Sequence, residues 1–167
     1  MAASDTQNPA VVIRRLDGDA EARACATLMS TTEPWIRFGR DFEKSYVLVR
    51  DPSREVYVAL SREPPDTGSV LGFVVLVMQG AFVGYIQSLA VDDRLRGRGI
   101  GTALMEYVEQ RIFRDQPNVF ICASSFNPGA QRLYERLGYL RVGELPDFMV
   151  AGHSEILYRK TVGPLAR

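Results

Sequence analysis

The chain has 167 residues, a length typical of a single domain with a sizeable hydrophobic core. Its 20 basic residues balance 20 acidic ones, so bulk electrostatics argue against a nucleic-acid or membrane partner. One histidine and two cysteines, without a Cys-x-x-Cys pair, give no metal-ligand spacing, and we expect no metal site.

The ends of the chain and its apolar runs predict a location and a domain plan. The start "MAASDTQNP" lacks the features of a secretory signal, and the run "FVVLVM" is too short to span a bilayer, so we expect a cytoplasmic protein. Cys25 and Cys122 lie among apolar neighbours, which predicts two buried free thiols. We expect a flexible N-terminus over residues 1–9, a single domain over 10–162 and a C-terminal tail over 163–167.

The first fifty residues predict a strand followed by two helices. Residues 10–16, "AVVIRRL", suit a strand. A helix should follow, with Asp17 or Asp19 as its cap and an apolar face formed by Ala22, Cys25, Leu28 and Met29. A second helix is expected around residues 40–50, with Phe42, Tyr46 and Val49 on one face, although "YVLV" within it would also suit a strand.

Three apolar segments then follow at short intervals: residues 55–60, 69–79 and 82–91. Their short connections predict antiparallel hairpins. The segments are apolar at consecutive positions, so we expect the sheet to be covered on both faces.

A glycine- and arginine-rich stretch, "DDRLRGRGIGTAL", occupies residues 92–104, before a helical pattern whose apolar positions are Ile100, Ala103, Leu104, Tyr107, Val108 and Ile112. A helix N-terminus has unpaired N–H groups that bind phosphate readily. Gly97, Gly99 and Gly101 lack the Cβ atoms that would hold an anion away. We expect the N–H groups of about Arg96 to Thr102 to bind a phosphate or pyrophosphate, the alternative being a plain surface turn. The stretch lacks both the Walker A sequence and a full Gly-x-Gly-x-x-Gly sequence.

The last third predicts one more strand, a short helix and two closing strands. A strand at 118–124 after the preceding helix implies a right-handed parallel crossover. Asn127 and Pro128 suit the start of a helix, and Gly138 suits its left-handed end. The segments "YLRVGEL" and "SEILYRKTV" predict the closing strands.

Two of these segments resemble known motifs. "LAVDDRLRGRGIGTALM" resembles the acyl-CoA-binding motif of the GNAT superfamily of N-acetyltransferases, Arg/Gln-x-x-Gly-x-Gly/Ala, whose positions are filled by Arg96, Gly99 and Gly101. "NPGAQRLYERLGY" is similar to a second motif of that family, at Asn127, Ala130, Tyr134, Gly138 and Tyr139. The resemblance implies an α/β fold with a splayed, mostly antiparallel sheet of about six to seven strands and about four helices on both faces. The sheet should open between "IQSLAV" and "VFICAS".

The resemblance also implies an activity: direct acyl transfer from acetyl-CoA, or another acyl-CoA, to an amine in a ternary complex. It assigns cofactor binding to Leu89, Ala90, Val91, Arg96, Gly97, Arg98, Gly99, Ile100, Gly101, Thr102, Asn127 and Tyr134. Tyr134 would be the general acid for the departing thiolate, although it also suits a core position. Asn127 could be a helix cap, a cofactor contact or both.

The general base and the acceptor site are less defined. Gln87 lies at or near the strand position where many relatives carry a glutamate, and a glutamine could only hold a water or orient the amine. Other candidate bases are Glu33, Asp147, His153 and Glu155. Acceptor binding is assigned to Glu33, Trp35, Phe38, Gln87 and Phe148, whose three aromatic side chains could equally form a small satellite core.

The acceptor could be a small-molecule amine or a protein amine, and a homodimer is an open alternative. Two other functions keep the glycine turn but not the chemistry: a non-catalytic acyl-CoA sensor and a nucleotide-phosphate binder. The missing strand glutamate favours a sensor, whereas Tyr134 favours an enzyme.

Overall fold

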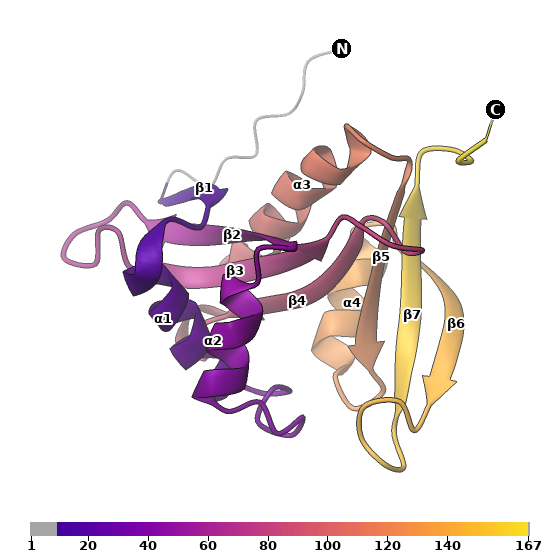
Figure 1. The fold of residues 1–167 in the computed structure, drawn as a ribbon, viewed down its shortest axis with the longest axis horizontal. Coiled ribbons are helices and arrows are strands. Elements are labelled where there is room, and N and C mark those ends of the chain that lie inside the picture. The colour runs from indigo at the N-terminus through magenta and orange to yellow at the C-terminus, as the bar shows by residue number, and fades with distance from the viewer. Residues whose placement is uncertain (1–9, 167) are drawn as a thin grey trace.

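A seven-stranded sheet in the order β1-β2-β3-β4-β5-β7-β6 forms the centre of the protein (Figure 1). The structure, a computed structural model, describes residues 10–166, so the segment predicted to be flexible, residues 1–9, lies outside the described part of the chain. The strands are β1 (Val11–Arg15), β2 (Arg54–Ser61), β3 (Val70–Val77), β4 (Tyr85–Val91), β5 (Asn118–Ser124), β6 (Leu140–Pro146) and β7 (Ser154–Thr161). The helices are α1 (Gly18–Ser30), α2 (Phe42–Arg50), α3 (Ile100–Phe113) and α4 (Pro128–Arg136).

Helices cover both faces of the sheet, as its apolar strands predict. Figure 1 shows α1 and α2 in front of β2 to β4, and α3 and α4 behind the sheet. Val58 and Phe73 belong to the core cluster on the α1 and α2 side, whereas their neighbours Ala59 and Val74 belong to the cluster on the α3 and α4 side. Because successive side chains of a strand point to opposite faces, a strand buried on both faces must be apolar throughout.

The predicted hairpins and crossover are confirmed. The β2–β3 and β3–β4 hairpins are antiparallel, and β4 pairs in parallel with β5 after the crossover through α3. β1 also pairs antiparallel with β2, across the two intervening helices. The second helix is also present, as α2. The sheet is therefore mixed and mostly antiparallel.

Three local predictions are wrong. The fourth strand begins at Tyr85 rather than at residue 82, because Gly84, with φ of +81°, still belongs to the turn. Tyr107 is 37% exposed, whereas Met105 fills the buried face of α3. Cys122 is only half-buried, because its strand borders a cavity.

The parallel pair of β4 and β5 is short, and this creates the site. The two strands pair only at Tyr85 with Phe120 and at Ile86 with Ile121, and then diverge (Figure 1). At the joined end, the Phe120 N–H donates to the Gly84 carbonyl at 3.0 Å. The Gln116 amide also donates to the carbonyl of Val83 at 2.6 Å. The sheet is thus closed at one end of this strand pair and open at the other.

Candidate active site

A cavity of about 830 Å³ lies between the diverging strands. This volume is within the usual range for small-molecule and cofactor sites. Its walls come from β4, β5, the start of α3, one face of α4 and the loop between α1 and α2. Most residues predicted for cofactor and acceptor binding line it: Glu33, Trp35, Phe38, Gln87, Leu89, Ala90, Val91, Arg96, Gly97, Gly99, Ile100, Gly101, Thr102, Asn127, Tyr134 and Phe148.

Three predicted residues are not part of the cavity wall. Arg98 lies in the glycine turn but does not line the cavity, since the turn presents its backbone there. Of the four alternative bases, Glu33 and Glu155 line the cavity, whereas Asp147 and His153 lie outside its wall. The last two belong to the loop between β6 and β7, where the Asp147 N–H donates to the His153 carbonyl at 3.0 Å and closes the turn.

The glycine turn has the geometry of an anion site. Gly97 and Gly99 have φ values of +79° and +81°, which side-chain-bearing residues rarely adopt. The first bond of α3 runs from the Ala103 N–H to the Gly99 carbonyl at 2.9 Å. The N–H groups of the preceding helical residues, Ile100 to Thr102, therefore have no intrahelical acceptor. A Cβ atom on Gly97 or Gly99 would meet no atom within 4 Å, so this side of the turn is open.

Arg96 connects this turn to the loop above the cavity. Its guanidinium forms an ion pair with Asp93 at 2.6 Å and donates to the Glu33 carbonyl at 3.2 Å. Arg94 points elsewhere and pairs with Asp92 at 2.6 Å, which holds the pKa of that carboxyl below its usual value. The arginines therefore organise the turn, and the backbone amides form its open surface.

Gln87 occupies a β-bulge. Val75 of β3 pairs with Ser88 and the next residue, Leu76, pairs with Ile86, which leaves Gln87 as the extra residue of β4. A bulge redirects a side chain and disturbs the ladder beside a site. The Gln87 amide oxygen accepts a hydrogen bond from Arg54 Nε at 2.9 Å. The group that Gln87 can offer to the cavity is therefore its NH₂ donor.

Tyr134 enters the cavity from α4 and is only 5% exposed. The Asn127 side chain caps this helix by accepting from the Ala130 N–H at 3.1 Å, as predicted. The rings of Tyr139 and Tyr158 lie 6.0 and 5.8 Å from the Tyr134 ring and fix its position. Burial raises the pKa of the Tyr134 hydroxyl, so it remains a proton donor at neutral pH.

Polar groups also line the side of the cavity opposite Tyr134, and of these the sequence analysis had named only Glu155, as a candidate base. The Tyr85 hydroxyl and the Cys122 thiol are neighbours in the cavity wall, and burial raises the pKa of both groups. The Ser124 hydroxyl donates to the Glu155 carboxylate, whose pKa is raised by burial and lowered less by that hydrogen bond. All four residues line the cavity. For Tyr85 and Ser124 the sequence carried no signal, whereas Cys122 lay on a strand bordering the predicted opening.

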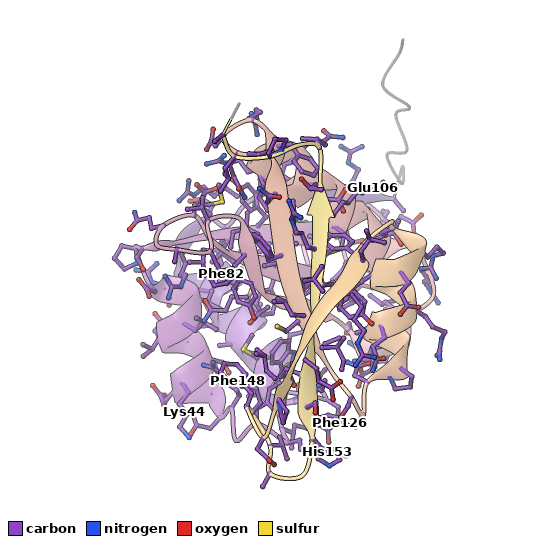
Figure 2. The ribbon with its side chains drawn as sticks, turned by 90° about the vertical axis from the view of Figure 1, so that its right-hand side faces the viewer. Lys44, Phe82, Glu106, Phe126, Phe148 and His153 are labelled. Carbon is purple, nitrogen blue, oxygen red and sulfur yellow. The ribbon has the colours of Figure 1, made fainter. Side chains whose placement is uncertain are left out.

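Aromatic rings join the loop between α1 and α2 to the loops that follow β5 and β6. Trp35 and Phe38 lie with ring centroids 5.8 Å apart, and Phe126 lies 6.3 Å from Phe38. Phe126 also contacts His153 at 4.9 Å, and Figure 2 shows this pair at the same end of the molecule as Phe148. Trp35 and Phe38 line the cavity and also pack on other rings, whereas their predicted role in acceptor binding stays a prediction. Phe148 is 60% exposed at the rim.

Residues 10–166 contain neither a cluster of metal-binding side chains nor a membrane-spanning helix. No group of three or more His, Cys, Asp or Glu side chains in this part could hold a metal ion. No helix there is long and apolar enough to cross a membrane.

Solved structures with this fold include acetyltransferases. The structure of Arabidopsis thaliana NAA60 in complex with acetyl-CoA superposes with a TM-score of 0.76 and 19% identity, over 91% of this chain and 98% of that one. An aminoglycoside 6′-N-acetyltransferase complexed with coenzyme A gives a TM-score of 0.72 and 20% identity, over 92% and 98% of the two chains. At such identities the likeness shows the fold alone.

Sequence comparison identifies the family. Over 100 residues the chain is 32% identical to the N-acetylaspartate synthetase of Danio rerio, covering 52% of this chain and 35% of that protein. Over 81 residues it is 35% identical to the S-(2-succino)cysteine N-acetyltransferase of Bacillus subtilis (strain 168), covering 47% and 48%. The match thus spans less than half of either relative. The profile of the acetyltransferase (GNAT) family matches residues 22–139, and the chain belongs to this family.

Proposed function

We propose that the protein is an N-acetyltransferase that transfers an acetyl group from acetyl-CoA to a primary amine within a ternary complex. One observation carries the proposal: a single cavity joins an open glycine turn at a helix N-terminus to a buried tyrosine, Tyr134. The turn suits a pyrophosphate, and Tyr134 suits a leaving thiolate. Two structures with the same fold, cited above, contain acetyl-CoA or coenzyme A.

The edge of β4 would bind the pantetheine arm. Beyond Ile86, β4 has no pairing with β5 among the described residues, although it continues to Val91. Its N–H and C=O groups on that side can pair with the amides of an extended ligand, as an added strand would. The thioester would then lie in the gap between the strands, with the pyrophosphate at the amides of residues 99–102.

The reaction forms a C–N bond and breaks the C–S bond. The amine nitrogen attacks the thioester carbonyl, a backbone N–H of β4 stabilises the negative charge on the oxygen, and the sulfur leaves as a thiolate. Tyr134 donates a hydrogen bond or a proton to that sulfur. Because a thiol has a pKa of about 8.5 and a phenol one of about 10, this transfer is not strongly driven, and the donation comes late in the step.

The acceptor is a small amine. Contacts among Trp35, Phe38, Phe126 and His153 join the loops around the acceptor end, which limits the room for a protein segment. The curated relatives named above carry names that refer to small molecules. The free thiols of Cys25 and Cys122 suit the reducing cytoplasm, which we propose as the location. A homodimer and a single domain over residues 10–162 remain predictions.

The test measures release of coenzyme A by the purified chain from acetyl-CoA over a panel of amines, with mass spectrometry of the products. Turnover with an acetylated product is expected. Isothermal titration with acetyl-CoA, coenzyme A and ATP runs beside it. Binding of acetyl-CoA without turnover of any amine would indicate a sensor instead. Binding of ATP without binding of coenzyme A would indicate a nucleotide-phosphate site.

A further inference from the structure

Tyr134 and Glu155 enter the cavity from opposite faces of the sheet. On β5 and β7, Ala123 and Ile156 belong to the core cluster that also contains Tyr134 of α4. Because side chains alternate along a strand, their neighbours Ser124 and Glu155 point to the other face. Ser124 pairs directly with Glu155 in the strand register, which explains their hydrogen bond. Tyr134 and Glu155 therefore lie on opposite sides of the opening between β4 and β5.

Glu155 differs from the other buried glutamates in having no cation. It is 6% exposed, and its pKa is shifted only by burial and by the hydrogen bond from Ser124. Glu109 is equally buried, but its carboxylate pairs with Lys160 Nζ at 2.6 Å. The half-buried Glu55 likewise pairs with Arg111 at 2.6 Å. A buried carboxylate without a cation is costly, and such groups are enriched at functional sites.

We propose that Glu155 receives the acceptor ammonium and acts as the general base of the transfer. This inference rests on the proposed function. The carboxylate pairs with the incoming R–NH₃⁺ group and takes one proton from it, which frees the lone pair for attack. Tyr134 gives a proton to the sulfur as the C–S bond breaks, and the second proton, which the nitrogen loses as the C–N bond forms, restores the Tyr134 hydroxyl through solvent. Overall, the ammonium and acetyl-CoA give the amide, the thiol and one proton, which leaves through Glu155 to water.

The surroundings of Glu155 support a base that works near neutral pH. Burial raises its pKa above the usual glutamate value, closer to that of the amine from which it takes the proton. Burial also raises the pKa values of Tyr85, Cys122 and Tyr134, which leaves these neighbours uncharged at neutral pH. The titratable and charged groups that share the cavity wall with it are Glu33, Arg40, Tyr85, Arg96, Cys122, Arg132, Tyr134 and Arg136.

The first test is Glu155→Gln, which keeps the shape and an acceptor for the Ser124 hydroxyl but removes the charge. For the amine that the wild type acetylates, we expect kcat/KM at neutral pH to fall about 100-fold or more. The Kd for acetyl-CoA should stay unchanged. The control is Glu106→Gln on α3, the same change outside the cavity wall and at the other end of the molecule from His153 (Figure 2). Its kcat/KM should equal that of the wild type.

The second test is the pH profile of kcat/KM for Ser124→Ala, which remains informative if Glu155→Gln fails to fold. The wild-type kcat/KM should fall with decreasing pH as Glu155 is protonated. The Ser124 hydrogen bond lowers the pKa of Glu155, so its removal should shift this limb to higher pH. Glu155→Gln should abolish the limb. A merely structural role for Ser124 would lower activity without moving the limb.

The outcomes separate this inference from the proposed function. If the wild type acetylates an amine and the kcat/KM of Glu155→Gln lies within a few-fold of the wild-type value, the inference on Glu155 is overturned while the proposed function stands. An acid limb that stays at the same pH in Ser124→Ala overturns it as well. A wild type that is inert with every amine overturns the proposed function, and the base with it.

Discussion

Replacing Gly99 by alanine should weaken coenzyme A binding much more than it destabilises the fold. Gly99 caps α3 with φ of +81°, and a Cβ atom there would meet no atom within 4 Å. The folding penalty is therefore backbone strain alone, about 1–2 kcal/mol for an L-residue in the left-handed region. For a chain of this size this lowers the Tm by roughly 2–8 °C. The same Cβ would lie where a phosphate must approach the amides, so we expect at least a tenfold loss of affinity, about 1.4 kcal/mol.

Gly68 provides the matched control. It lies in the link between β2 and β3, has φ of +86°, and a Cβ atom there would also meet nothing within 4 Å. Gly68→Ala should thus lower the Tm by a similar amount without changing the affinity. Thermal unfolding and isothermal titration with coenzyme A measure both quantities. Equal affinities of Gly99→Ala and Gly68→Ala for coenzyme A would refute the reasoning, because strain would then account for the whole effect.

Three further predictions concern the acid, the closed end of the cavity and the thiols. Tyr134→Phe should lower kcat about 100-fold with little change in the Kd for acetyl-CoA, and full turnover would remove Tyr134 as the acid. Gly84→Ala would place a Cβ 2.6 Å from the Asn118 carbonyl oxygen at φ of +81°. It should lower the free energy of unfolding by about 2–5 kcal/mol in urea denaturation, and a loss under 1 kcal/mol would contradict this. Iodoacetamide should modify the half-buried Cys122 before Cys25, because Cys25 is buried and its pKa is raised by that burial to about 12. Acetyl-CoA should slow the modification of Cys122. Mass spectrometry that shows Cys25 modified first would refute this prediction.

The sequence predicted those parts of the site that depend on local chemistry. The turn at Gly97 and Gly99 and the helix between Asn127 and Gly138 are set by residues with strong backbone preferences, so they could be located from their neighbours. The layer order followed from strands that are apolar throughout. The resemblance to the GNAT superfamily placed the opening between the two strands that do diverge.

The acceptor side could not be predicted in the same way. Which of Asp147, His153 and Glu155 reaches the cavity depends on the path of the β6–β7 loop and on the register of β7 against β5. Neither is encoded in short-range spacing. Gln87 likewise gained its orientation from a one-residue bulge, and Tyr85 met Cys122 only through the pairing of β4 with β5. Tertiary contacts decided each of these positions.

The most direct test of the central claim is the ¹H–¹⁵N NMR spectrum of the labelled chain during titration with acetyl-CoA. If the turn amides bind the pyrophosphate and the β4 edge binds the pantetheine arm, the largest amide shifts should fall in residues 97–102 and 89–91. The amides of residues 114–116, which follow the opposite end of α3, should not move. Saturable binding that leaves residues 97–102 unshifted would contradict the account.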